Sequence, residues 1–277
     1  MTGSELDPDA FNAFEAAGWE RRAAGYDALF GQITPRFAER LLDAADVRRG
    51  ARVLDVACGP GYVAAAAARR GASVVGVDVA ETMLALARRA HPELELLAAD
   101  AEDLPFADAT FDAVVANFLL LHLGRPERAV TGFARVLRPG GRVALTVWDV
   151  PDRARFVGVW LDAVAAAGAR PPEDIPAGPP FFRFSDEDEF ARLLIGAGLE
   201  RIVLQRLTST LRVASADAFW DGFLGGTVRT SALVERQAPE TRDAIRTAFD
   251  EIVREYAAGD GLELPVSVVL GSGARLA

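Results

Sequence analysis

A carboxylate and two glycines stand close together early in the chain, at a spacing that suits a binding site for a small charged ligand. Asp55 interrupts the short apolar run 53–57, Gly59 and Gly61 follow it, and an alanine-rich helix is expected over 63–70. Glycine has no Cβ, so backbone N–H groups in such a turn can approach a ligand closely, and the helix N-terminus adds a partial positive charge. The pattern therefore predicts a strand, a tight turn and a helix that together bind a ligand.

The spacing of these glycines leaves two kinds of ligand open. Gly59-x-Gly61-x-x-Ala64 satisfies the loose dinucleotide fingerprint, with the acidic Asp78 at about the expected distance downstream. A carboxylate at Asp55, just before the turn, would repel a pyrophosphate and would suit an ammonium group. The residues therefore favour a ligand with a cationic amino-acid end and a nucleoside end, while an NAD-dependent oxidoreductase stays the main alternative.

The stretch 55–61 resembles motif I of the class I S-adenosylmethionine-dependent methyltransferases, D/E-x-G-x-G-x-G, and the similarity covers about residues 50–150. One position departs from the motif, because Ala57 stands where its first glycine usually lies. The run 104–106 (Leu-Pro-Phe) and the Leu-x-Pro-Gly-Gly run 137–141 are typical of small-molecule members with a methyltransferase-11 type domain. The resemblance implies S-adenosylmethionine as the cofactor and S-adenosylhomocysteine as the product.

This resemblance gives roles to polar residues at the ends of successive predicted strands. Asp78 ends the predicted strand 73–78, where a carboxylate can accept hydrogen bonds from both ribose hydroxyls. Asp100 and the backbone of Ala101 match the positions that bind adenine in the family, and Asp55 matches one near the methionine end. The full set of expected cofactor contacts is Tyr26, Asp55, Ala57, Gly59, Gly61, Asp78, Val79, Met83, Asp100, Ala101 and Asn117.

His122 is one of two histidines and lies in the apolar run 119–123, beside the expected site of methyl transfer. Imidazole titrates near neutral pH, so this side chain is a candidate general base that removes a proton from a substrate hydroxyl. The alternative is a packed or capping histidine without a catalytic role. No cluster of metal-ligating residues stands out in the sequence, so no metal is expected.

Apolar β-branched runs alternate with helical segments, which predicts an α/β Rossmann-like fold with helices on both faces of the sheet. The resemblance implies seven mostly parallel strands, with an antiparallel last strand over about 266–271. Aromatic residues at helical spacing over 11–26 predict an N-terminal helix, which in the family often lies over the cofactor as a lid. The expected organisation is a helical lid (1–46), a cofactor-binding core (47–150) and the rest of the sheet with substrate-cap insertions (151–277).

Signals in the C-terminal half are weaker. The run 185–188 (Ser-Asp-Glu-Asp) matches a capping box, with Ser185 as the cap of a helix over 185–197. Phe219, Trp220 and Phe223 lie at helical spacing and are expected either to pack in the core of the cap or to stack on a substrate.

Bulk composition disfavours several classes of function. The chain has 277 residues, a hydrophobic fraction of 51% and a formal net charge of −10. Lys and Arg do not cluster, so a nucleic-acid substrate is not expected. The sequence has no apolar run of the roughly 20 residues that a membrane-spanning helix needs. The N-terminus is polar and acidic, unlike a signal peptide, and a single cysteine, Cys58, suits the reducing cytoplasm.

These features together predict a cytoplasmic enzyme that transfers a methyl group from S-adenosylmethionine to O, N or C of a small-molecule acceptor, in natural-product or quinone-type biosynthesis. A protein that binds S-adenosylmethionine without methylating is a second alternative, and it would lack an open acceptor pocket. The sequence names no protein partner and leaves a homo-oligomer open.

Overall fold

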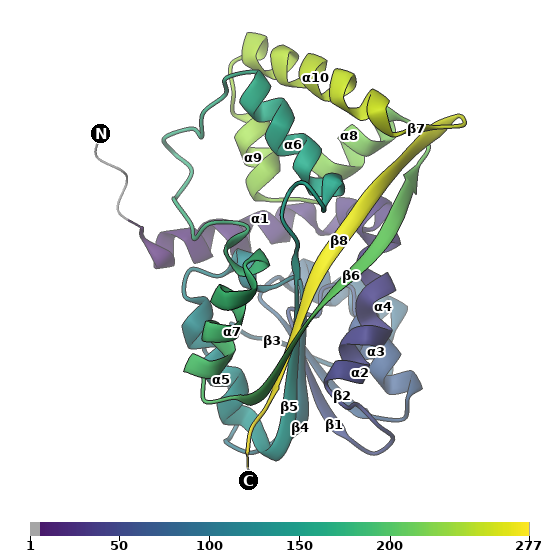
Figure 1. The fold of residues 1–277 in the computed structure, drawn as a ribbon. Coiled ribbons are helices and arrows are strands. Elements are labelled where there is room, and N and C mark those ends of the chain that lie inside the picture. The colour runs from purple at the N-terminus through teal and green to yellow at the C-terminus, as the bar shows by residue number, and fades with distance from the viewer. Residues whose placement is uncertain (1–5, 277) are drawn as a thin grey trace.

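The fold is described from a computed structural model that covers residues 6–276. Its centre is a twisted sheet whose main path has the strand order β3-β2-β1-β4-β5-β8-β6 (Figure 1). The pairs formed among β1 to β5 are parallel, whereas β8 is antiparallel to both of its neighbours, β5 and β6. The strands are β1 (Arg52–Val56), β2 (Ser73–Asp78), β3 (Glu95–Ala98), β4 (Phe111–Asn117), β5 (Leu137–Trp148), β6 (Glu200–Val213), β7 (Ala257–Ala258) and β8 (Gly261–Ala274).

This topology confirms the predicted Rossmann-like fold with an antiparallel strand near the C-terminus. The sheet has eight strands rather than the expected seven, because the two-residue β7 pairs with the start of β8. β8 is also longer than the predicted 266–271, and it pairs with β6 over most of its length. Both strands extend beyond the other strands and reach into a group of helices at one end of the sheet (Figure 1).

The helices form three groups around this sheet (Figure 1). α2, α3 and α4 cover one face, α5 and α7 cover the other, and α6, α8, α9 and α10 form a cap beyond the end of β5. The bounds are α1 (Pro8–Leu29), α2 (Ala38–Ala44), α3 (Tyr62–Arg69), α4 (Glu81–Ala90), α5 (Pro126–Val136), α6 (Arg155–Ala166), α7 (Glu187–Gly196), α8 (Ala216–Gly225), α9 (Arg229–Glu235) and α10 (Pro239–Val253). None of the helices within residues 6–276 combines the length and the apolar character needed to span a bilayer.

Helix α1 lies between the core and the cap, where it contacts α4 on one side and α8 on the other (Figure 1). It begins at Pro8, and the Asp7 side chain caps it by accepting from the backbone N–H groups of Asp9 and Ala10. In its middle, the Glu20 carboxylate accepts from the backbone N–H groups of Glu81 and Thr82, at the start of α4. Those N–H groups have no partner inside α4, so Glu20 both satisfies them and fixes α1 to the core.

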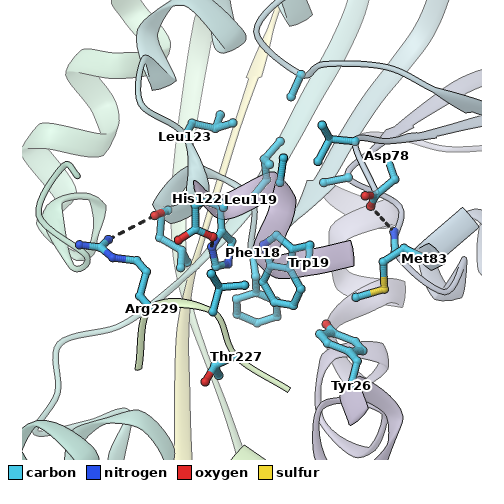
Figure 2. Close-up of a pocket in the computed structure, with 18 of the residues that line it drawn as sticks. Trp19, Tyr26, Asp78, Met83, Phe118, Leu119, His122, Leu123, Thr227 and Arg229 are labelled. Atoms are coloured by element: carbon cyan, nitrogen blue, oxygen red, sulfur yellow. Dashed lines mark hydrogen bonds and ion pairs between the residues drawn. The ribbon is translucent and has the colours of Figure 1, made fainter. Parts of the chain in front are cut away.

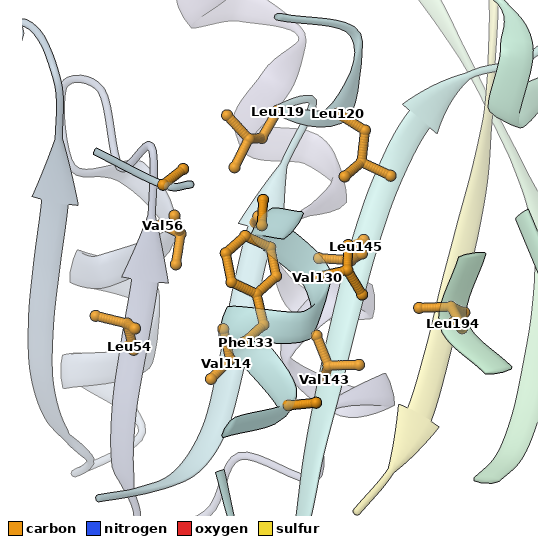
Figure 3. Close-up of a cluster of buried hydrophobic side chains, with 14 of the residues drawn as sticks. Leu54, Val56, Val114, Leu119, Leu120, Val130, Phe133, Val143, Leu145 and Leu194 are labelled. Atoms are coloured by element: carbon orange, nitrogen blue, oxygen red, sulfur yellow. The ribbon is translucent and has the colours of Figure 1, made fainter. Parts of the chain in front are cut away.

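Strands β1, β4 and β5 are covered on both faces, which explains their nearly continuous apolar sequences. On the α5 side, Leu54, Val114, Phe133 and Leu145 are fully buried in one cluster (Figure 3). Burying a side chain of this size contributes roughly 1.5–3 kcal/mol to folding. This cluster keeps the ends of the strands in a fixed relation to each other.

A second cluster forms the core of the cap and is largely aromatic. Phe219 and Phe223 are fully buried there and pack against Trp160, with Phe223 stacked on the indole at 4.6 Å between ring centroids. Phe219 therefore packs in the core of the cap, which was one of the two expectations for these aromatic residues. Phe223 packs there too and also lines the cavity described below. The cap of α7 differs from the expectation: Asp186 rather than Ser185 accepts from the Glu189 backbone N–H.

Candidate functional site

A cavity of about 350 Å³ lies at the C-terminal ends of the parallel strands, beneath α1. Ligands bind at this edge of open α/β sheets. Figure 2 shows Asp78 and Arg229 on opposite sides of the cavity, with Trp19, Phe118 and His122 between them. We refer below to the Asp78 end and the Arg229 end. Every candidate residue from the sequence lines this cavity except Asp55 and Gly61; the lining members are Tyr26, Ala57, Gly59, Asp78, Val79, Met83, Asp100, Ala101, Asn117 and His122.

The turn after β1 is built from left-handed backbone. Ala57, Gly59 and Gly61 have φ values of 56°, 51° and 89°. A Cβ added at Gly59 would meet no atom within 4 Å, so the backbone there faces open space that a ligand can fill. A Cβ at Gly61 would lie 3.3 Å from Ala87 Cβ, so this glycine serves the contact between α3 and α4. The left-handed conformation also explains why a glycine is usual at position 57, since a Cβ there costs roughly 1–2 kcal/mol.

Asp78 ends β2 with its carboxylate directed at the glycine turn. Oδ1 accepts from the Ala80 backbone N–H and Oδ2 accepts from that of Gly59, both at 2.9 Å. Burial raises the pKa of this carboxyl group. A carboxylate offers about four acceptor sites, so two remain for a ligand at the cavity surface. That is the number a vicinal diol such as ribose requires.

The Asp78 end is mostly apolar apart from its carboxylates. Met83 is 3% exposed in the first turn of α4, and Ala101 is also buried. Asp100 is exposed, and its Oδ1 accepts from the Glu102 backbone N–H, which shapes the loop after β3. Val79 is 49% exposed and follows directly on Asp78.

Asn117 and Tyr26 connect the middle of the cavity to the N-terminal segment. Asn117 donates through Nδ2 to the Thr34 carbonyl and accepts through Oδ1 from Thr146 Oγ1. Tyr26 stacks on Phe30, and burial raises the pKa of its hydroxyl to about 12. Because both Asn117 side-chain atoms are already paired, its side chain holds the end of β4 against the 30–34 segment.

Asp55 lies in β1 under the glycine turn and does not reach the cavity surface. Only 1% of its surface is exposed, and its Oδ2 has no hydrogen-bond partner within residues 6–276. Burial raises the pKa of this carboxyl group to about 8, with Asp78 adding a smaller effect of the same sign. The expected contact between Asp55 and an ammonium group therefore stays a prediction, because the carboxyl group is buried away from the cavity and keeps its proton up to about pH 8.

The Asp55→Asn variant is expected to weaken the pH dependence of stability. The unfolded chain loses this proton near pH 3.9, the ordinary value for Asp, whereas the folded protein keeps it up to about pH 8. The unfolded state therefore binds fewer protons within this window, and the contribution of Asp55 to the free energy of unfolding falls by about 1.4 kcal/mol per pH unit as the pH rises. Urea unfolding of both proteins at about pH 5 and about pH 7 measures the difference. If the free energy of unfolding falls equally in the two proteins between these pH values, the raised pKa of Asp55 is contradicted.

The short 3-10 segment Leu120–His122 places the imidazole of His122 at the cavity. Its Nδ1 lies 2.9 Å from Oε2 of Glu15, and the Trp19 ring packs edge-on against it at 5.0 Å between centroids. Glu15 is a carboxylate on α1 with only 3% of its surface exposed. An Nδ1–H that donates to Glu15 leaves Nε2 as the acceptor nitrogen. The pair can therefore accept a proton from a hydroxyl group in the cavity.

The sequence interpretation missed Glu15 and Arg229, which both line the cavity. A signal for Glu15 was available, because Phe11, Glu15 and Trp19 follow one another at intervals of four residues. This spacing puts a carboxylate on the apolar face of α1, where a charge needs a partner. Arg229 had no such signal, since the helix that begins there, α9, was not predicted.

Comparisons with known proteins agree with this geometry. A model of the methyltransferase domain matches residues 54–145. Demethylmenaquinone methyltransferase of Renibacterium salmoninarum is 32% identical over 212 residues, which cover 72% of this chain and 86% of that protein. The fold is similar to that of Haemonchus contortus phosphoethanolamine N-methyltransferase 2, solved in complex with S-adenosyl-L-methionine: the TM-score is 0.57 at 18% identity, covering 99% of this chain and 61% of that one. A protein of Bacillus halodurans gives a TM-score of 0.57 at 21% identity, covering 87% of this chain and 99% of that one. The domain match begins in β1 and ends within β5, so it includes the glycine turn and the C-terminal ends of β1 to β4.

Proposed function

Since the chain belongs to the class I S-adenosylmethionine-dependent methyltransferases, we propose that its acceptor is an apolar aromatic compound with an acidic hydroxyl group, such as a quinol. The cofactor is S-adenosylmethionine, and the acceptor is a small molecule. An NAD-dependent oxidoreductase is not favoured, because the relatives are methyltransferases. The identity of the acceptor and the residues that act on it are the proposal.

The cofactor would be held at the Asp78 end. Asp78 would accept from the ribose hydroxyls, Asp100 and the Ala101 backbone would bind adenine, and Met83 would pack against the ring. The open backbone at Gly59 and the two free acceptor sites of Asp78 support this orientation. When bound, the cofactor supplies a methyl group on a sulfonium, which is already activated for transfer to a nucleophile.

The observation that carries the proposed acceptor class is the lining of the cavity away from Asp78. Apolar and aromatic side chains make up much of this lining, around the hydrogen-bonded pair of His122 and Glu15 and the cation Arg229, while Asn12, Thr227 and Thr230 add neutral polar groups. The apolar members are Trp19, Phe118, Leu119, Leu121, Trp148, Phe181 and Phe223. An aromatic acceptor would bury its ring against these side chains. Its hydroxyl group would then lie against the His122–Glu15 pair, which can take a proton.

His122 would act as the general base in this proposal. The carboxylate of Glu15 orients the ring through Nδ1 and favours the protonated imidazole once the proton has moved to Nε2. The remaining task of the protein is alignment, because the nucleophile must approach the methyl group in line. The description of the R. salmoninarum relative names demethylmenaquinone, a quinone whose reduced form is an aromatic quinol with hydroxyl groups, which supports an acceptor of this type.

We propose that the chain has the organisation predicted from the sequence: a lid over 1–46, a cofactor-binding core over 47–150 and an acceptor cap over 151–277. The contacts of Glu20 with the start of α4 and the position of Glu15 in the cavity support a lid role for α1.

Binding and turnover should be measured separately. Calorimetric titration is expected to give tight binding of S-adenosylmethionine and S-adenosylhomocysteine and none of NAD. Mass spectrometry then measures how much S-adenosylhomocysteine forms when either naphthohydroquinone or phosphoethanolamine is supplied as the acceptor. Turnover with the quinol alone is the expected result, and turnover with phosphoethanolamine alone would overturn the proposed acceptor class.

A further inference from the structure

Arg229 is a partly buried cation on the far side of the cavity from Asp78 (Figure 2). It is the one arginine among the described residues that line the cavity. Its guanidinium lies between two aromatic rings, 5.2 Å from the centroid of Phe11 and 5.5 Å from that of Phe181. Burial lowers the pKa of this side chain, and Glu15 is the charged group that acts against this effect. A charge kept in such a place has a desolvation cost that an anionic partner would offset.

The protein itself supplies only part of the hydrogen bonding that Arg229 can make. One terminal nitrogen, Nη1, donates to the carbonyls of Pro179 and Leu121, at 3.2 and 3.4 Å. Within residues 6–276, Nε and Nη2 make no hydrogen bond, and no ion pair includes Arg229. Both Nε and Nη2 keep some solvent-accessible surface, because neither is a fully buried atom that lacks a hydrogen-bond partner. The side chain therefore presents unused donors from a planar, permanently charged group.

We propose that Arg229 binds an anionic oxygen group on the acceptor, a carboxylate in particular, so that among aromatic hydroxy compounds those that also carry a carboxylate bind more tightly than a plain quinol. This inference rests on the proposed function, because it places the acceptor ring in the aromatic part of the cavity. A carboxylate matches the fork of a guanidinium and gives short, charge-assisted hydrogen bonds. Arg229 Nη1 donates to the carbonyl of Leu121, the neighbour of His122, and Figure 2 shows His122 between Arg229 and Asp78. An acceptor ring between the two ends of the cavity would therefore lie near both Arg229 and His122. Arg229 then fixes which edge of the ring faces the methyl donor.

Two other roles for Arg229 lead to different results. It could be only a structural link, since its two carbonyl partners belong to the 170–184 loop and to the segment that carries His122. It could instead pair with the carboxylate of the cofactor. A structural link predicts a loss of thermal stability on mutation without a change in ligand preference, and a cofactor contact predicts a loss of S-adenosylhomocysteine affinity.

The test uses a ligand pair that differs only in charge and cannot be methylated at a hydroxyl group. Naphthoate and its neutral amide, naphthamide, are titrated into the full chain saturated with S-adenosylhomocysteine. The wild type is expected to bind naphthoate about tenfold or more tightly than naphthamide, as for a charged hydrogen-bonded pair. In Arg229→Gln the two affinities are expected to agree within about threefold, with S-adenosylhomocysteine affinity unchanged. Arg229→Lys, which keeps the charge without the fork, should retain part of the preference.

Arg246→Gln is the matched control. Arg246 also lies over an aromatic ring of the cap, 5.1 Å from the centroid of Trp220, but it does not line the cavity. This variant should keep the full preference for naphthoate. Equal binding of the two ligands by the wild type, or a preference that survives in Arg229→Gln, would overturn the assignment. Binding of naphthoate is independent of turnover, so an absent methylation activity would count against the proposed function and not against the anion site.

Discussion

Replacing Asp78 with alanine is expected to weaken S-adenosylmethionine binding by about two to four orders of magnitude. The variant would lose two hydrogen bonds from ribose hydroxyls to a carboxylate, and each bond to a charged group contributes roughly 1.5–3 kcal/mol. It would also leave the backbone N–H groups of Gly59 and Ala80 without their acceptor, so the turn itself becomes less defined. Calorimetric titration of both proteins with S-adenosylmethionine measures the effect.

A second aspartate serves as a matched control for this experiment. Asp112 also accepts a backbone N–H, from Arg52, and pairs with Arg138, but it does not line the cavity. Asp112→Ala should therefore keep the affinity for S-adenosylmethionine. Circular dichroism on Asp78→Ala separates lost binding from lost folding. Wild-type affinity in a folded Asp78→Ala protein would remove Asp78 from the ribose site.

The His122→Ala variant is expected to lower kcat by about 10²- to 10⁴-fold, the usual contribution of a positioned general base. Its affinity for S-adenosylmethionine should stay within about threefold of the wild type, because imidazole would act on the acceptor and not on the cofactor. Full turnover across the pH range in which the protein is folded would remove His122 from the mechanism. In that case the histidine would be the packed residue that the sequence left as the alternative.

Glu15→Gln tests whether the carboxylate positions this base. Glutamine keeps the size of the side chain and can still accept from Nδ1, but it cannot stabilise the charged imidazolium. We expect kcat to fall by about tenfold or more while KM for the acceptor changes little. A nitrogen-15 NMR spectrum of His122 should show the proton fixed on Nδ1 in the wild type and a mixture of tautomers in the variant. An unchanged spectrum and an unchanged kcat would contradict the positioning role.

The fold and the Asp78 end could be predicted from the sequence because their signals are local. Strand β2 and Asp78 occupy one run of sequence, and the glycine turn follows β1 directly. Backbone conformation also explains the one departure from the motif: position 57 is left-handed, and alanine is the smallest residue with a Cβ that can stand there. In such segments the spacing of residues along the chain decides their arrangement in space.

The Arg229 end could not be predicted in the same way. Glu15 and His122 are 107 residues apart in the sequence, and Arg229 is 108 residues beyond Leu121, whose carbonyl it contacts. Their meeting depends on how α1 and the cap pack on the sheet, and no local pattern encodes that packing. The same reason explains the lengths of β6 and β8, since each strand extends as far as its partner allows.

The position of α1 has a consequence for the order of events in a catalytic cycle. One helix both covers the cavity, through the contact of Glu20 with α4, and carries the carboxylate that pairs with His122. If α1 is the lid that we propose, moving it aside to exchange the spent cofactor also separates Glu15 from His122. Proton removal and cofactor exchange then cannot occur at the same time. The His122–Glu15 pair is therefore formed next to the sulfonium only while α1 covers the cavity.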